Sequence, residues 1–248
     1  MPSKGPEIAY SDIHCHVLPG LDDGPKDMEA SLALVRSAQR SGAKRIVATP
    51  HFLPGVFEPA TGEIRLQLGL LKERLQREAI DIEILEGCEA YLSERLCSDF
   101  RDGRILTIGG GSYVLVELPA MMLPQGSMEE LFALLTLGAG VVLAHPERSM
   151  ELRRKPEILR QLVDAGVLLQ VNAGSLVGAH GREAASFASS LVAEGMAHFI
   201  GSDAHSGLDE DLLKGGPDIR PALRRVFRRD AVAKRFLRHA EDRFNQIV

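Results

Sequence analysis

The sequence predicts an α/β fold with a parallel sheet, and two observations lead to this prediction. Short apolar runs rich in β-branched residues recur along the 248 residues, and segments of helical periodicity lie between them. Strand–helix alternation repeated about seven times is typical of parallel β-α units. No glycine-rich nucleotide-binding loop follows the first expected strand, and the pattern leaves open a closed barrel or an open doubly wound sheet.

The expected strands are short and the expected helices are amphipathic. Strands are expected at Ile8–Ile13, Lys44–Thr49, Ile80–Gly87, Tyr113–Glu117, Gly140–Ala144, Val167–Asn172 and His198–Gly201. Helices are expected at Met28–Ser41, Glu63–Glu78, Met128–Leu137, Pro156–Ala165 and Glu183–Glu194. In the first of these helices Leu32, Val35 and Ala38 fall on one face, and Gly42 stands where the helix should end.

Length and composition fit one large soluble α/β domain, which we expect over residues 1–248, or at most two small ones. The chain is 45% hydrophobic, enough for a large aliphatic core. A net charge of −5 argues against a general binder of nucleic acid or membrane surfaces. The Arg-rich stretch 220–243 carries both charge signs and is interpreted as a solvated helix face. We expect a cytoplasmic protein, because there is no signal sequence, no membrane-spanning run and no CxxC pair among three cysteines.

The first expected strand ends in two histidines. His14 and His16 are spaced at the strand period of two, so both side chains should leave the same face. Two imidazoles on one face make half of a metal site. Asp23 follows in a Leu-Asp-Asp-Gly-Pro turn that can fold a carboxylate back over the strand end.

Every other expected strand also ends in a polar residue. These residues are His51, Glu89, Glu117, His145, Asn172, Asp203 and His205. In a parallel barrel the functional groups gather at the carboxyl ends of the strands. Five of the eight histidines therefore stand at strand ends, whereas His180, His198 and His239 do not and are interpreted as surface or packing residues.

Nine of these side chains are candidate metal ligands, which is too many for one ion. The set is His14, His16, Asp23, His51, Glu89, Glu117, His145, Asp203 and His205. Mixed imidazole and carboxylate ligands suit two or three divalent ions of Mn, Fe or Zn. Such a site attracts phosphate dianions. Arg148 could bind phosphate oxygens or could pair with Glu147 or Glu151.

Two other chemistries are excluded by spacing. A cysteine phosphatase needs an Arg six positions after its Cys, and Leu21, Glu94 and Gly103 stand at those positions. No G-x-S-x-G elbow is present. The cysteines Cys15, Cys88 and Cys97 are interpreted as small packing residues.

In order along the chain, these motifs resemble the PHP (polymerase and histidinol phosphatase) superfamily, and within it the CpsB/YwqE-type bacterial protein-tyrosine phosphatases. The matching segments include Asp12-Ile-His-Cys-His16, Ala144-His-Pro-Glu-Arg148 and Gly201-Ser-Asp-Ala-His205. The resemblance implies a distorted (β/α)7 TIM-like barrel of the PHP fold. It also implies three divalent ions, with Mn preferred over Fe or Zn, and hydrolysis of phosphotyrosine on the tail of a bacterial tyrosine kinase that controls capsule or exopolysaccharide synthesis.

Carried over by motif, the resemblance implies three ligand sets. They are His14, His16, Glu89 and Asp203; Glu89, Glu117 and His145; and Asp23, His51 and His205. Arg148 would bind phosphate and act in catalysis, and either a metal ion or His205 would assist the leaving group. Arg220 would bind substrate from a loop longer than is usual in the family. Phe52 replaces a frequent second histidine. The alternatives are a small-molecule phosphatase, for example on histidinol phosphate, and a non-catalytic regulatory partner.

Overall fold

A computed structural model describes residues 9–207, 216–227 and 230–248. Its strands are β1 (Tyr10–Cys15), β2 (Ala43–Ala48), β3 (His51–Phe52), β4 (Glu83–Leu85), β5 (Glu89–Tyr91), β6 (Tyr113–Glu117), β7 (Gly140–Ala144), β8 (Leu168–Asn172) and β9 (Phe199–Gly201). Its helices are α1 (Met28–Ser41), α2 (Thr61–Arg77), α3 (Leu96–Arg101), α4 (Ser127–Thr136), α5 (Met150–Arg154), α6 (Pro156–Asp164), α7 (Ala173–Val177), α8 (Gly181–Ala193), α9 (Arg220–Val226) and α10 (Asp230–Ile247). Two 3-10 turns are η1 (Ile108–Gly110) and η2 (Pro146–Arg148).

All strand pairs are parallel and follow the chain order. One sheet has the order β1-β2-β4 and the other β3-β5-β6-β7-β8-β9. β2 pairs with β4, and just beyond them β3 pairs with β5. β2 and β3 therefore share one position, as do β4 and β5, and the nine described strands fill seven positions. The expected third strand, Ile80–Gly87, is wrong in extent: only β4 lies within that range, and β5 begins beyond it at Glu89.

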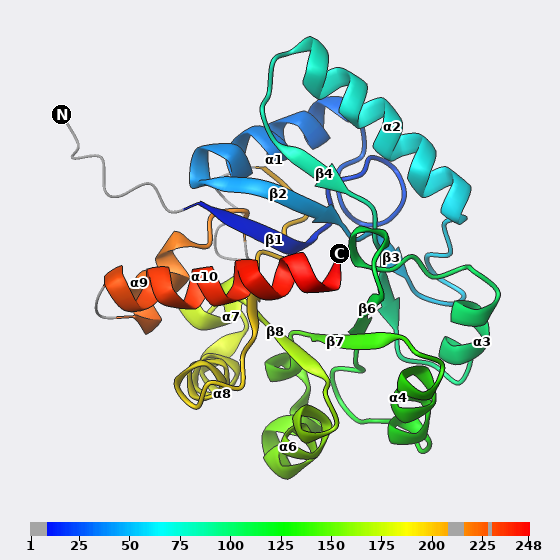
Figure 1. The fold of residues 1–248 in the computed structure, drawn as a ribbon, viewed down its shortest axis with the longest axis vertical. Helices are drawn as coiled ribbons and strands as arrows, with labels where there is room; N and C mark the ends of the chain where they lie inside the picture. Colours follow the sequence, from blue (N-terminus) through cyan, green and yellow to red (C-terminus); the bar gives the residue numbers. More distant parts are fainter. Residues whose placement is uncertain (1–8, 208–215, 228–229) are drawn as a thin grey trace.

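The strands close into a distorted barrel (Figure 1). Cys15 at the end of β1 forms a parallel bridge with Ala204, just after β9. His16 N–H donates to the Ala204 carbonyl at 2.9 Å, and Asp203 N–H donates to the His14 carbonyl at 2.9 Å. Since the first and last strands are neighbours, the barrel alternative holds and the open doubly wound sheet does not.

Helix ends follow the local sequence. Asp27 caps α1 by accepting a hydrogen bond from Ala30 N–H at 2.9 Å, and Gly42 ends the helix in the left-handed region at φ 104°. Both bounds of α1 match the prediction. Its buried face, which includes Leu32, Val35 and Ala38, packs into the outer hydrophobic layer around the barrel.

The C-terminal helix α10 lies across the barrel (Figure 1). Phe244 and Ile247 are buried with the barrel-lining residues Ile13 and Val47. The interpretation of stretch 220–243 as a solvated face is thus too simple, because α10 buries one side, including Leu237. Within the described ranges, no helix combines the length and apolarity needed to cross a membrane.

Candidate metal centre

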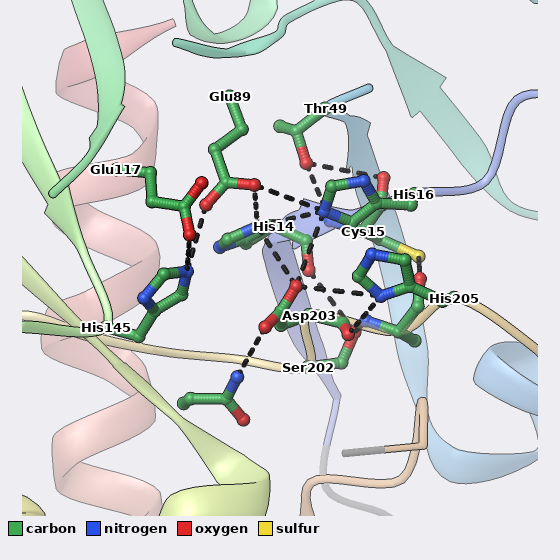
Figure 2. A network of polar contacts seen from close by, with 12 residues as sticks. His14, Cys15, His16, Thr49, Glu89, Glu117, His145, Ser202, Asp203 and His205 are labelled. Carbon is green, nitrogen blue, oxygen red and sulfur yellow. Dashed lines mark hydrogen bonds and ion pairs between the residues drawn. The ribbon is translucent and has the colours of Figure 1, made fainter. Parts of the chain in front are cut away.

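The carboxyl ends of the strands bring together the imidazoles and carboxylates that the sequence singles out. Figure 2 shows that one place is shared by side chains from the ends of several strands: His14, His16, Glu89, Glu117, His145, Asp203 and His205. His14 and His16 are both fully buried. Their Nε2 atoms lie 3.2 Å apart, as expected for side chains on one face of β1. All nine candidate ligands belong to groups whose ligand atoms lie within 4.8 Å of one another.

Four ligand atoms form a compact group. Glu89 Oε2 lies 3.2 Å from His14 Nε2 and 3.4 Å from His16 Nε2, and Asp203 Oδ1 lies 3.3 and 3.4 Å from the same two nitrogens. Ligand atoms about 2.1 Å from a Zn- or Mn-sized ion are about 3.0–3.4 Å apart at octahedral or tetrahedral angles. These spacings fit a metal ion, and this set is the first of the three expected.

Glu89 links the groups and provides a second test of the fit. Its Oε2 atom lies 3.0 Å from His51 Nδ1, yet both atoms are buried and neither makes a hydrogen bond. Buried polar atoms without hydrogen bonds are costly, and coordination of a shared cation would satisfy both. The other oxygen of Glu89 lies 2.9 Å from His145 Nε2.

The remaining candidates group partly as expected. Asp23 Oδ1 lies 3.2 Å from His205 Nε2 and 3.7 Å from His51 Nε2, which unites the expected third set. In the expected second set, Glu117 Oε1 lies 4.0 Å from His145 Nε2. The geometry also offers combinations that the sequence did not anticipate. These are His51 with Glu89 and Glu117, His14 with Glu89, His145 and Asp203, and His16 with Asp23, His51 and His205.

Two candidate ligands have strained backbones. His145 and Asp203 have φ values of 30° and 53°, in the left-handed region that non-glycine residues rarely adopt. His145 directly follows β7, and Asp203 stands two residues beyond the end of β9. Such strain tends to persist at functional sites, where the surrounding structure holds it.

Three residues outside the nine candidate ligands hold those ligands in place, and of the three only Asn172 was singled out by its place at a strand end. Gln170 Oε1 lies 3.0 Å from His14 Nδ1. Asp22 Oδ2 lies 2.7 Å from His16 Nδ1, and Asn172 Nδ2 donates to Asp203 Oδ2 at 2.7 Å. Outer partners of this kind fix the orientation of metal ligands. The available signals were weak: Asp22 adjoins Asp23, and Gln170 lies two positions before the strand end at Asn172.

Charge at the centre is strongly coupled. Burial alone would lower the pKa of His14, but the Glu89 and Asp203 carboxylates raise it to about 9. Burial would raise the pKa of Glu89, but the neighbouring histidines hold it well below its usual value. Burial and the charge of Glu89 raise the pKa of Glu117. The carboxylates therefore attract positive charge strongly, as a site for divalent ions requires.

The two arginines that the sequence nominated lie at different ends of the barrel. Arg148 Nη1 donates to Asp203 Oδ2 at 2.9 Å, so it borders the centre and does not pair with Glu147 or Glu151. Arg220 instead donates to Asp218 and to the Arg40 carbonyl at the end of α1. The structure does not bring Arg220 to the centre: its partner Asp218 follows Pro217, whose carbonyl accepts a 2.7 Å hydrogen bond from the hydroxyl of Tyr10 at the start of β1.

A parallel β/α barrel with a mixed imidazole and carboxylate centre at its mouth defines a class of barrel metalloproteins. The family model described as "Capsular polysaccharide synthesis, CpsB/CapC" matches residues 10–234. The chain therefore belongs to the CpsB/CapC family, which confirms the membership that its motifs predict.

Relatives of known structure and name agree with this membership. The tyrosine-protein phosphatase YwqE of Bacillus subtilis is 35% identical over 195 residues, covering 79% of this chain and 77% of the relative. The crystal structures of YwqE and of CpsB from Streptococcus pneumoniae are described as metal-dependent tyrosine phosphatases, and the matched chain has a TM-score of 0.86 at 31% identity, covering 96% of this chain and 95% of that chain. A histidinol phosphate phosphatase from Lactococcus lactis, with a TM-score of 0.55 at 16% identity over 89% of this chain and 92% of that chain, shares the fold alone.

Proposed function

We propose that this protein is a metal-dependent phosphomonoesterase that hydrolyses phosphotyrosine in proteins. The observation that carries the proposal is the convergence of nine imidazole and carboxylate side chains at the barrel mouth, with Arg148 at their edge. The names of the similar proteins support the same activity. Residues 1–248 would form one catalytic domain.

The nine ligands would hold three divalent ions, with Mn as the first choice and Fe or Zn as alternatives. When bound, such ions supply Lewis acidity to phosphoryl oxygens and make water a stronger nucleophile near neutral pH. The residues around them set the ligand orientations. Gln170 and Asp22 fix the ring positions of His14 and His16.

Arg148 is the residue that we propose for binding the phosphoryl group. One of its nitrogens donates to Asp203, and the side chain is 36% exposed, so further donors remain for non-bridging oxygens. A guanidinium held in this way stabilises the negative charge of the phosphoryl group during transfer.

His205 is better suited to be a ligand than a proton donor. Its Nδ1 lies 3.0 Å from the Asp203 carbonyl oxygen, which can only accept, so Nδ1 carries the proton. The Nε2 lone pair is then free for coordination and faces Asp23. Phenolate is a good leaving group, with a pKa of about 10, and needs less protonation than an alkoxide. Because the Nδ1 proton is already donated to the Asp203 carbonyl, a catalytic proton from His205 would have to come from the imidazolium form.

The family description links the chain to capsular polysaccharide synthesis. We propose that its substrate is the phosphotyrosine-bearing tail of a bacterial tyrosine kinase that controls this synthesis, encountered in the cytoplasm. Such a tail is flexible, and recognition would rest mainly on the phosphotyrosine itself.

The test is a Mn-dependence assay on a phosphotyrosine peptide. We expect His145→Ala to lose turnover about 100-fold or more and Arg148→Ala to lose kcat/KM about 10- to 100-fold. The matched control is Arg160→Ala, which removes an exposed arginine paired with Glu194. Full activity in both variants would defeat the assignment. Faster turnover of histidinol phosphate than of the peptide would favour a small-molecule phosphatase, and full metal content without any turnover would favour a regulatory partner.

A further inference from the structure

A cavity of about 820 Å³ adjoins the metal centre. Asp203, His205 and Arg148 line one part of it. Beyond them the lining includes His180 and the small residues Ala30 and Ala33 of α1. The cavity therefore joins the proposed phosphoryl position to a space that nothing in the catalytic scheme above uses.

His180 reaches this cavity from the connection between β8 and α8. Connections that follow barrel strands lie at the carboxyl end of the barrel, beside the centre. The buried hydroxyl of Ser175, in α7, shares a hydrogen bond of 2.9 Å with His180 Nδ1 and so fixes the plane of the ring. The interpretation of His180 as a surface or packing residue is incomplete, because His180 stands in a loop between α7 and α8 that the fold brings to the wall of this cavity.

The ring of His180 can contact an aromatic group without adding charge. Burial and the nearby positive charge of Arg148 lower the pKa of His180 to about 4, so the ring is neutral at pH 7. A neutral imidazole is a flat surface on which another aromatic ring can stack. Ala30 and Ala33 leave room for such a ring because their side chains are single methyl groups.

We propose that His180 contacts the substrate by forming one wall of the leaving-group subsite, where it stacks on the aromatic ring of phosphotyrosine. Ser175 is a positioning residue for that wall. The proposal rests on the proposed function, since a phosphoryl group held beside Arg148 would direct its ester substituent into the same cavity. It explains how the site would favour aryl over alkyl phosphates.

The test compares the affinities of the metal-loaded protein for phenylphosphonate and methylphosphonate, which differ by the ring and are not hydrolysed. We expect His180→Ala to reduce the preference for phenylphosphonate about fivefold and to leave methylphosphonate affinity within about twofold. His180→Phe keeps a flat ring and should retain most of the preference. His198→Ala is the matched control: His198 is also partly buried with a pKa lowered to about 4, but it stands before β9, at the other end of the barrel.

A second variant keeps the proposal testable if His180→Ala does not fold. Ala33 is exposed in the cavity wall, and Ala33→Trp should fill the subsite and weaken phenylphosphonate binding alone. An unchanged preference in His180→Ala or in Ala33→Trp would overturn the proposal, as would equal loss of both ligands or a wild-type protein without any preference. Failure of the proposed function appears separately, as a normal preference without hydrolysis of a phosphotyrosine peptide.

Discussion

Asp22 holds His16 at the centre through a 2.7 Å contact between its Oδ2 atom and His16 Nδ1. The same carboxylate oxygen accepts a hydrogen bond from His51 N–H at 3.0 Å. One buried side chain thus connects the end of β1 with the start of β3, where two candidate ligands stand. Because Nδ1 is occupied, the Nε2 atom of His16 is the one that faces Glu89 and Asp203.

Replacing Asp22 should therefore weaken metal binding without removing a ligand. We expect Asp22→Asn to lower metal affinity about 10- to 100-fold, with turnover restored at high Mn concentration. The measurement is a metal titration followed by activity. Asp164→Asn is the control, since Asp164 is exposed at the end of α6. Equal affinities in wild type and Asp22→Asn would contradict this role.

Glu89 should be the least replaceable carboxylate. Its oxygens lie within 3.4 Å of nitrogens from four histidines. Glutamine is the matched replacement, because it has nearly the same volume but no charge. We expect Glu89→Gln to lose bound metal, measured by elemental analysis, and to lose turnover about 100-fold or more. Glu86→Gln provides the control, because Glu86 pairs with the exposed Arg65. Retention of wild-type metal content by Glu89→Gln would argue against a bridging role.

Removal of metal should make stability depend on pH in the alkaline range. The folded-state pKa of His14 is raised to about 9 from 6.5. The contribution of His14 to folding stability is therefore complete below about pH 6.5 and is lost as pH rises through 9. The metal-free protein should therefore melt at least about 3 °C lower at pH 9 than at pH 6.5. Thermal scans of the metal-loaded protein should show a smaller change, and a metal-free protein that melts higher at pH 9 would contradict the expected sign.

Lowering the pH should also destabilise the metal-free centre, through a carboxylate in place of a histidine. The pKa of Asp23 is lowered to about 2 from 3.8 by His205. The contribution of Asp23 to folding stability is therefore present above about pH 3.8 and is lost as pH falls through 2. In the metal-free protein, Asp23→Asn should flatten the stability profile across this window, as measured by chemical denaturation. The same slope in wild type and variant would exclude Asp23 as a source.

Thiol reagents should leave turnover nearly intact. Cys15, Cys88 and Cys97 are buried and form no disulfide. Burial raises the pKa of Cys88 to about 12 and of Cys97 to about 11, so neither is a thiolate at neutral pH. Activity should survive treatment of the native protein with iodoacetamide and should disappear with a chelator. Rapid inactivation by iodoacetamide with full metal content would point to a cysteine mechanism instead.

The sequence alone determined the α/β fold class and indicated nine candidate ligands that the structure brings together. Alternation of strand and helix patterns predicts parallel β-α units, and polar residues at successive strand ends predict a shared site, because parallel strands deliver their carboxyl ends to one edge. Local periodicity also located α1 at Met28–Ser41. These features can be predicted because each is written in a short stretch of chain, as its hydrophobic periodicity or as the residue type at a strand end.

Tertiary structure decided what depends on distant parts of the chain. Closure through Cys15 and Ala204 distinguishes a barrel from an open sheet, and it joins segments 189 residues apart. The orienting roles of Asp22 and Gln170, and the distance of Arg220 from the centre, likewise follow from packing between separate elements. Hydrogen bonds and ion pairs are made in three dimensions at about 3 Å, and residue order along the chain does not fix which partners meet.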